Sequence, residues 1–203
     1  MIYRFMFVGY TDDPSRIKIR EGLDCYVALS VNTGKVFMYV ETRQETVDPE
    51  LLADGEMIPY PNGKKWDMAN EIFHYSRPVS DEQWHRKIEY KKPHVMVNYL
   101  KPDKVSSYIY YHYQYQEEYP GDGDRYGIIY LHGQQIIFYL EDPVEVETEE
   151  ISGSLTTMNT PKTQWSELMN MHFVDRWRDI EILEYSQTTI LFKNCNRDLK
   201  LNS

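Results

Sequence analysis

The sequence predicts an α+β protein built from two similar halves, and three repeated features lead to this expectation. Residues 24–41 form a β-hairpin pattern, in which two β-rich runs flank an Asn-Thr-Gly turn. The same pattern returns 100 residues later, at 124–141. An apolar strand candidate precedes each hairpin, at 2–10 and at 94–100. A repeat of this kind favours two copies of one supersecondary unit.

The two hairpins match position by position. After a shift of 100 residues, these pairs coincide: Asp24 with Asp124, Tyr26 with Tyr126, Leu29 with Ile129, Tyr39 with Tyr139, and Glu41 with Glu141. Each hairpin then leads through a long polar stretch to a tryptophan, over 25 positions to Trp66 and over 24 positions to Trp165. The matched spacing favours a repeat over a chance pairing of two common hairpins. We expect each tryptophan to begin a helix.

The connection between the first strand and the hairpin differs between the halves, with 13 residues in the first and 23 in the second. The longer connection predicts a helix of about four turns over 103–118, because Pro102 suits a first helical position and Pro120 follows its end. The shorter connection holds at most a short helix. Ser80 predicts a second, capped helix over 80–87. The order of elements is that of the ferredoxin-like βαββαβ unit.

These elements predict the organisation of the whole chain. Residues 1–90 form a degenerate ferredoxin-like half, and residues 91–192 form the half with the long helix. A polar tail follows at 193–203. The segment 142–160 is acidic and then rich in Ser and Thr, which predicts an exposed loop.

Composition excludes several classes of function. The formal net charge of −10 argues against nucleic acid and anionic membrane surfaces as partners. No run of 18 apolar residues is present, so the sequence predicts no membrane span. Two cysteines, Cys25 and Cys195, form no disulfide framework, and no histidines have a metal-ligand spacing. We therefore expect a cytoplasmic protein without metal or cofactor.

One helical face could support chemistry. Tyr108 and His112 are four residues apart on the predicted helix, which puts them on one face with Cβ atoms about 5–6 Å apart. Gln116 flanks that face. A histidine that titrates near neutrality can give and take protons, and a tyrosine can supply a hydrogen bond. A purely structural pair is the alternative interpretation.

The C-terminal half resembles the L-rhamnose mutarotase family over roughly residues 92–186. That family has a strand, a helix with Tyr-x-x-x-His, a hairpin that ends in an aromatic-rich strand, and a helix whose tryptophan precedes an Arg-Trp pair by twelve residues. Here Tyr108 and His112 provide the first motif, and Phe138-Tyr139-Leu140-Glu141 ends the hairpin. Trp165 is followed twelve residues later by Trp177.

The resemblance implies a dimeric α+β barrel, which the two fused halves would form as an internal pseudo-dimer, either as a monomer or as a homodimer. It implies a cofactor-independent sugar mutarotase that interconverts monosaccharide anomers by acid/base catalysis. By position, His112 is the acid/base, Tyr108 its partner and Trp165 the platform for the sugar ring. Gln116, Tyr139 and Trp177 complete the expected substrate-binding set.

Two departures from the family pattern keep other functions open. The first half has no Tyr-x-x-x-His, and the segment between the second hairpin and Trp165 is longer than in the family. A non-catalytic barrel that binds or senses a small ligand is therefore the main alternative. A cofactor-free oxygenase is a third option, which rests on fold analogy alone.

Overall fold

The computed structural model is a mixed α+β structure of mostly antiparallel strands, and it describes residues 1–88, 90–147, 153 and 164–186. The chain divides into two compact units. Unit 1 comprises Met1–Asp67, Pro78–Tyr90 and, among the described residues, 183–186. Unit 2 comprises Met68–Arg77 and Lys91–Ile182. Each unit thus includes a short segment from the other half of the sequence, across the predicted boundary at residue 90.

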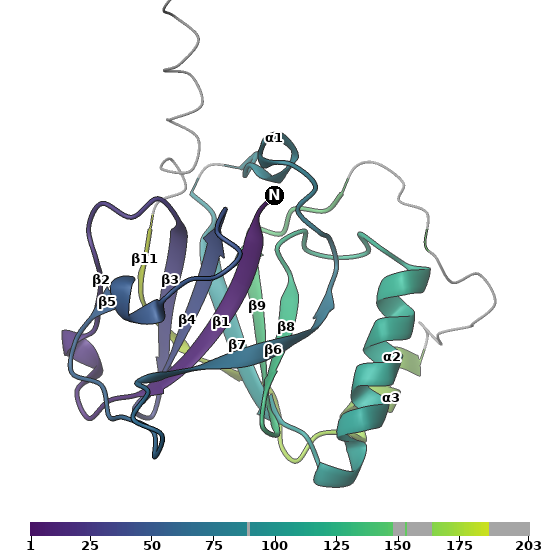
Figure 1. Cartoon of the computed structure of the whole chain (residues 1–203). Coiled ribbons are helices and arrows are strands. Elements are labelled where there is room, and N and C mark those ends of the chain that lie inside the picture. Colours follow the sequence, from purple (N-terminus) through teal and green to yellow (C-terminus); the bar gives the residue numbers. More distant parts are fainter. Residues whose placement is uncertain (89, 148–152, 154–163, 187–203) are drawn as a thin grey trace, which may run out of the picture. The chain divides into compact units, whose positions relative to one another are not determined.

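The sheet of unit 2 has the strand order β10-β7-β9-β8-β6, and all neighbouring strands in it are antiparallel. Its strands are β6 (Trp66–His74), β7 (Lys92–Tyr99), β8 (Ile128–His132), β9 (Gln135–Asp142) and β10 (Arg178–Asp179). Two helices, α2 (Val105–Glu118) and α3 (Trp165–Asn170), lie side by side next to this sheet (Figure 1). The predicted strand, long helix and second hairpin are confirmed.

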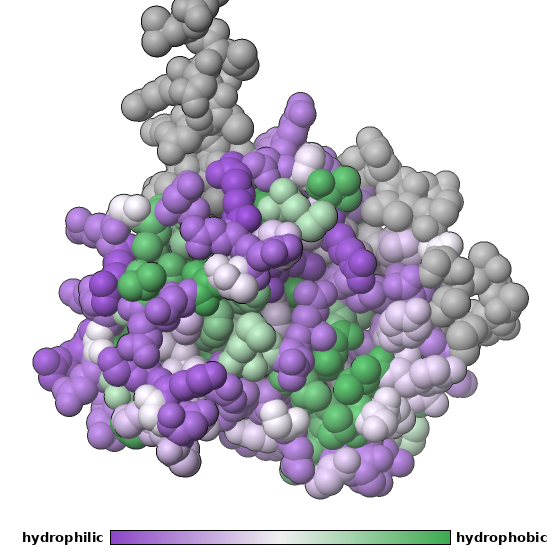
Figure 2. All heavy atoms as spheres, in the orientation of Figure 1, coloured by the Kyte–Doolittle hydropathy of each residue, from purple (hydrophilic) through white to green (hydrophobic). Residues whose placement is uncertain are grey.

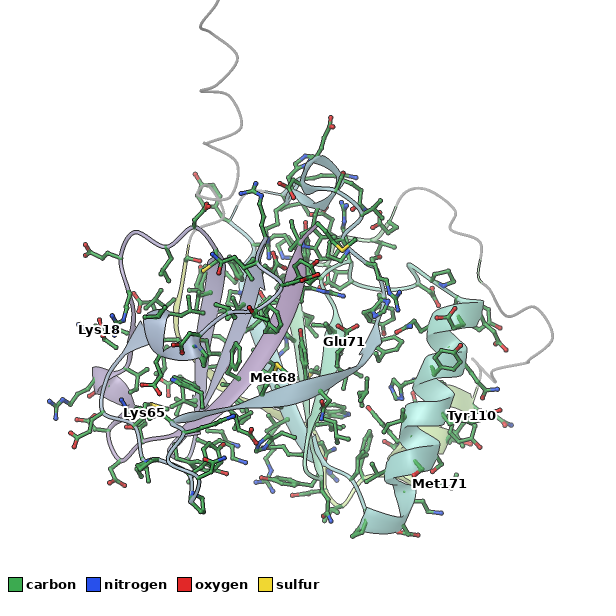
Figure 3. The ribbon with its side chains drawn as sticks, in the orientation of Figure 1. Lys18, Lys65, Met68, Glu71, Tyr110 and Met171 are labelled. Atoms are coloured by element: carbon green, nitrogen blue, oxygen red, sulfur yellow. The ribbon has the colours of Figure 1, made fainter. Side chains whose placement is uncertain are left out.

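The helix α2 follows a short 3-10 turn, η3 (Pro102–Lys104), and ends before Gly121, whose φ of 78° favours glycine. Its residues divide between two faces with the helical period. Tyr108 and His112 are buried toward the sheet, where Tyr108 packs with Ile129 and Ile136 of β8 and β9. Tyr110 points away from the sheet and is half exposed (Figure 3).

The sheet of unit 1 has the order β1-β4-β3-β11. Its strands are β1 (Tyr3–Tyr10), β3 (Tyr26–Asn32), β4 (Lys35–Thr42) and β11 (Glu181–Tyr185), and a separate pair is formed by β2 (Lys18–Ile19) and β5 (Ala53–Asp54). The helical elements are short: η1 (Pro14–Arg16), η2 (Pro49–Leu51) and α1 (Asp81–Trp84). Ser80 caps α1 as predicted, because its hydroxyl accepts the Gln83 N–H at 3.1 Å.

The predicted helix at Trp66 is wrong, since Trp66 begins strand β6. Gly9 on β1 lies next to the Trp66 indole. A Cβ at Gly9 would lie 3.0 Å from Cε3 of Trp66, so the missing side chain leaves the space that the buried indole fills. The helix predicted at Trp165 is confirmed as α3.

The repeat between the two hairpins extends to the register of their strands. Leu29 pairs with Met38, and Ile129 pairs with Phe138, each 100 residues on. The strand before each hairpin also takes the same place, because Phe7 pairs with Met38 and Met96 with Phe138. Both units therefore present equivalent side chains on the same face of a three-stranded core.

Parts of the sequence prediction lie outside the described residues, namely the polar tail at 193–203 and most of the loop at 142–160. Within the part of the chain that the structure describes, no helix is both long enough and apolar enough to cross a membrane.

Candidate functional site

A cavity of about 330 Å³ lies in unit 2, between the sheet and the helices α2 and α3. Eight of its lining residues are Phe, Tyr or Trp, contributed by β6, β9, both helices and the segments next to them. Figure 2 shows apolar side chains gathered between the strands of unit 2 and α2, bordered by polar ones. The volume falls in the range of small-ligand pockets, which are mostly apolar with a few polar groups.

His112, the histidine of the predicted pair, lines this cavity, and a hydrogen bond determines which of its ring nitrogens carries the proton. His112 Nδ1 donates to the carbonyl oxygen of Tyr108 at 2.9 Å, because that oxygen can only accept. The lone pair therefore lies on Nε2, which has no hydrogen-bond partner among the described residues. Burial lowers the pKa of His112 to about 4, against a smaller opposing effect of the backbone hydrogen bond. The imidazole is neutral at pH 7.

The tyrosine of the pair lies directly beside it. The Tyr108 ring centroid is 4.0 Å from that of His112, and the residue is 1% exposed. No described residue forms a hydrogen bond with its hydroxyl. Burial raises the pKa of Tyr108 well above its ordinary value, and the neighbouring Tyr75 raises it further. The phenol is therefore a protonated donor in the same cavity.

Two tryptophans complete the aromatic wall, as the sequence predicted. The Trp165 ring, at the start of α3, lies 5.0 Å from the His112 ring and 4.7 Å from the Tyr115 ring. The Trp177 ring lies 5.4 Å from that of Phe173. Both tryptophans line the cavity. The structure therefore brings together Tyr108, His112, Trp165 and Trp177.

Gln116 and Tyr139 are not brought into the cavity wall. The Gln116 side chain accepts the backbone N–H of His74 at 3.0 Å and donates to Glu117 at 3.3 Å. Tyr139 lies on β9, where neighbouring side chains point to opposite faces, so Phe138 lines the cavity instead. The Tyr139 hydroxyl donates to Glu141 at 2.7 Å.

Sequence reasoning missed Tyr75 and Tyr115 as cavity residues. Tyr115 follows His112 by three positions, so the helical period could have indicated it. Its hydroxyl donates to Asp122 at 2.5 Å. Tyr75 comes from the first half of the sequence, and no local pattern connects it to α2. Its ring packs on two glycines, since a Cβ at Gly123 or Gly127 would lie 2.5 or 2.7 Å from ring atoms.

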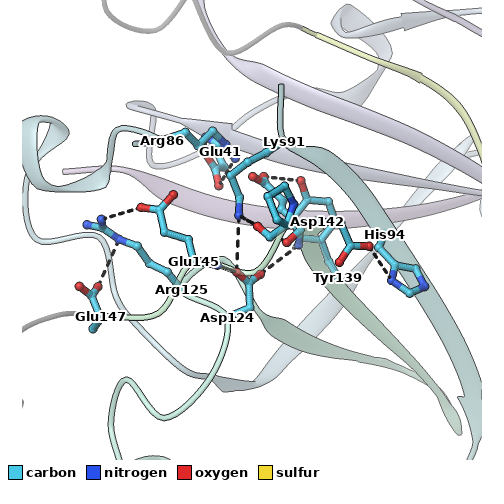
Figure 4. Close-up of polar contacts among 12 residues, drawn as sticks. Glu41, Arg86, Lys91, His94, Asp124, Arg125, Tyr139, Asp142, Glu145 and Glu147 are labelled. Atoms are coloured by element: carbon cyan, nitrogen blue, oxygen red, sulfur yellow. Dashed lines mark hydrogen bonds and ion pairs between the residues drawn. The ribbon is translucent and has the colours of Figure 1, made fainter. Parts of the chain in front are cut away.

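Each unit contains buried ionic groups (Figure 4). In unit 1, Arg86 makes two hydrogen bonds to the fully buried Glu41, at 2.8 and 3.1 Å. In unit 2, Lys91 Nζ lies 3.8 Å from Asp124 and contacts the carbonyl oxygens of Glu141 and Pro143. These charges compensate one another, which is typical of structural networks. Within the described ranges, no group of three or more His, Cys, Asp or Glu residues could hold a metal ion.

Unit 1 has a smaller recess of about 210 Å³ with a different character. Its charged side chains pair with each other, Arg20 with Asp54 at 2.8 Å and Lys65 with Glu50 at 3.2 Å. All four are well exposed, so water screens these pairs. The cavity of unit 2 is therefore the better candidate for a functional site.

No protein-family model, curated protein or solved structure matches this chain.

Proposed function

We propose that unit 2 binds a monosaccharide in its aromatic cavity and interconverts the sugar anomers. The observation that carries this proposal is a pair of polar groups in a mostly aromatic cavity, His112 Nε2 and the Tyr108 hydroxyl. Neither has a hydrogen-bond partner among the described residues. One is an acceptor and the other a donor, which suits a ligand rich in hydroxyl groups. The indole of Trp165 offers an apolar face for the C–H side of a sugar ring.

The proposal includes a specific fold. The elements of unit 2 follow the order β7, α2, β8, β9, α3, β10, with the strand order β10-β7-β9-β8. This supports a ferredoxin-like βαββαβ unit. Unit 1 repeats the first strand and the hairpin in the same register. We therefore infer two fused ferredoxin-like halves, of the kind that pair in dimeric α+β barrels.

The proposed reaction needs one base and one donor. His112 Nε2 accepts the proton of the anomeric hydroxyl, and the bond between the anomeric carbon and the ring oxygen breaks. The ring oxygen takes the proton of the Tyr108 hydroxyl, which regains a proton when the ring closes. Rotation of the resulting aldehyde and the reverse steps then close the ring on the other face. A neutral imidazole and a protonated phenol are the starting forms that this sequence requires.

A non-catalytic binding function is the second candidate, and the same pKa shifts favour it. A histidine with a pKa of about 4 is a weak base at neutral pH. A tyrosine whose pKa is raised by burial is a weak acid. Both groups would then serve as hydrogen-bond partners for a bound ligand without transferring protons.

Saturation-transfer NMR on the purified protein tests both candidates. The ligands are L-rhamnose, L-fucose and D-ribose, and the same spectra report exchange between anomeric protons. We expect binding and accelerated exchange, loss of exchange in His112→Ala, and weaker binding in Trp165→Leu. His85→Ala is the matched control, because His85 is exposed and lies in unit 1.

The outcomes separate the candidates. Binding without exchange would contradict the isomerase and support the binding function. Neither binding nor exchange with any of the sugars would contradict both. Exchange that persists in His112→Ala would remove the proposed base from the mechanism.

A further inference from the structure

We propose that the cavity of unit 2 selects its ligand by charge: it prefers a ligand with a protonated amine to an uncharged one and excludes carboxylates and phosphates. Resting on the proposed function, this makes an amino sugar the preferred substrate class. The inference is drawn from the aromatic wall, from the side chains behind it and from the absence of basic groups among the described lining residues.

The cavity wall presents the faces of aromatic rings to a ligand. Its described residues include no basic side chain that could compensate the charge of an anionic ligand. Eight of the lining side chains are Phe, Tyr or Trp, and no Lys or Arg is found among the described residues that line the cavity. The face of an aromatic ring carries partial negative charge and attracts an ammonium group, most strongly for tryptophan. Trp165 and Tyr115 lie 4.7 Å apart, so an amine next to one ring is also close to the other.

Carboxylates lie behind this wall. Asp122 accepts the Tyr115 hydroxyl at 2.5 Å, so its negative charge acts at the edge of the cavity. Asp122 and Asp124 both raise the pKa of Tyr75, which lines the same cavity. Asp124 is partly compensated, since Lys91 lies 3.8 Å away and two backbone N–H groups donate to it. Asp122 is exposed to solvent and accepts the hydroxyl of a lining residue, so it is the carboxylate that a charge-neutralising variant can test.

Among the described lining residues, the remaining titratable groups supply no positive charge. His112 is neutral at pH 7, because burial lowers its pKa to about 4. Burial raises the pKa of Tyr75, Tyr108 and Tyr115, so the three phenols remain protonated. An anionic ligand would lose its hydration without gaining a cation, whereas an ammonium group gains π faces and a nearby carboxylate.

The test compares three sugars that differ mainly in charge: D-glucosamine, D-glucose and D-glucuronate. Tetramethylammonium is added as a cation without a sugar ring. Affinities are measured by isothermal titration calorimetry at pH 6, where the amine of glucosamine is protonated. A desolvated cation–π contact is worth enough to predict that glucosamine binds about ten- to thirtyfold more tightly than glucose. Glucuronate should bind more weakly than glucose.

A charge-neutralising variant tests the origin of this preference. Asp122→Asn removes the negative charge and keeps an oxygen that can accept the Tyr115 hydroxyl. We expect the ratio of glucosamine to glucose affinity to fall several-fold, while the affinity for glucose stays within about twofold. The matched control is Asp103→Asn, an exposed position on η3 outside the cavity wall, which should leave the ratio unchanged.

The results distinguish this inference from the proposed function. Equal affinities for the three sugars would overturn charge selection and leave sugar binding intact. Binding of tetramethylammonium but of no sugar would support charge selection and contradict the proposed function. Failure of all four probes to bind would overturn both. If Asp122→Asn does not fold, the order of affinities in the unmodified protein still decides the question.

Discussion

Each unit contains three equivalent strands, and the same face of these strands has different surroundings in the two units. In unit 1 this face is part of a filled hydrophobic core, whereas in unit 2 it forms the floor of a cavity. The equivalent residues are Phe7, Leu29 and Met38 in unit 1, and Met96, Ile129 and Phe138 in unit 2. The first three belong to a hydrophobic core cluster, and the second three line the candidate site. The sheets have the same register, so the difference must come from what covers them.

The covering elements differ because the connections differ in length. In unit 1 the connections form only short 3-10 turns and the small pair β2 and β5, and Ile17, Leu52 and Trp66 pack in the core cluster with the sheet residues. In unit 2 the longer first connection forms the 14-residue helix α2, which carries Tyr108 and His112. The comparison indicates that the length of the connection, rather than the sheet, decides which half forms the aromatic cavity.

The largest expected effect comes from breaking the buried ion pair of unit 1. Arg86→Ala leaves Glu41, which is 0% exposed, without the cation that binds it at 2.8 Å. An uncompensated buried charge costs about 3–5 kcal/mol of unfolding free energy. Urea denaturation followed by tryptophan fluorescence measures this loss. The control Arg178→Ala removes an exposed pair with Asp175 and should cost less than about 1 kcal/mol. Equal losses in the two variants would contradict the structural role of Glu41.

Truncation at the paired position of the two sheets tests the comparison directly. Met38→Ala removes a fully buried side chain and should cost about 2–5 kcal/mol. Phe138→Ala should cost less than Met38→Ala, although phenylalanine is larger, because Phe138 is partly exposed and already borders a cavity. The same urea experiment compares them. A larger loss for Phe138→Ala would mean that the cavity wall is as tightly packed as the core of unit 1.

Sequence reasoning predicted the repeated elements well, because their signals are local. The turn at Thr33 and Gly34 has the positive φ angles, 50° and 75°, that the Asn-Thr-Gly pattern favours. The helix over 103–118 was indicated by Pro102 and by the length of its connection, and α2 begins and ends close to those bounds. Elements fixed by local chain chemistry can be predicted without the tertiary fold.

Three features were not predicted from the sequence, and two of them depend on contacts between residues that are far apart in the chain. Trp66 begins strand β6, and its indole packs beside Gly9, which lies 57 positions earlier. Tyr139 was expected in the site, but the alternation of β9 brings Phe138 to the cavity. Tyr75 reaches the cavity because strand β6 pairs with β8 of the other half of the sequence. The contacts of Trp66 and Tyr75 join distant parts of the sequence, whereas the alternation along β9 is a local pattern that could have indicated Phe138.

The pH dependence of stability should distinguish the cavity from the core. Since burial lowers the pKa of His112 from 6.5 to about 4, the unfolded chain binds more protons than the folded one between these values. This histidine therefore reduces the unfolding free energy as the pH falls from 6.5 to 4, by as much as about 3 kcal/mol. In His112→Phe that part of the loss should disappear. Urea denaturation at pH 7 and pH 4.5 measures the difference, with the exposed His85 as control in His85→Phe. An unchanged pH dependence in His112→Phe would mean that His112 is more hydrated than the structure indicates.

The smallest expected effect on stability comes from removing one tyrosine hydroxyl at the cavity. It tests whether ligand affinity depends on the cavity wall or only on overall stability. Tyr115→Phe removes the hydrogen bond to Asp122 and keeps the ring next to Trp165, so it should cost about 1 kcal/mol. Tyr60→Phe in unit 1 is its matched control, because the Tyr60 hydroxyl donates to the carbonyl oxygen of Val8 at 3.0 Å. We expect similar losses of stability in urea.

Ligand affinity, measured by calorimetry with the tightest-binding sugar, should change only in Tyr115→Phe. The bond between Tyr115 and Asp122 connects α2 to the segment with Gly123 and Gly127, on which Tyr75 packs. Its loss should therefore disturb the cavity wall, whereas Tyr60 belongs to unit 1 and is not among the described lining residues. If Tyr60→Phe lowered the affinity as much as Tyr115→Phe, the cavity would be responding to overall stability. The two units would then differ in their stability, and the hydrogen bond between Tyr115 and Asp122 would have no separate role in ligand binding.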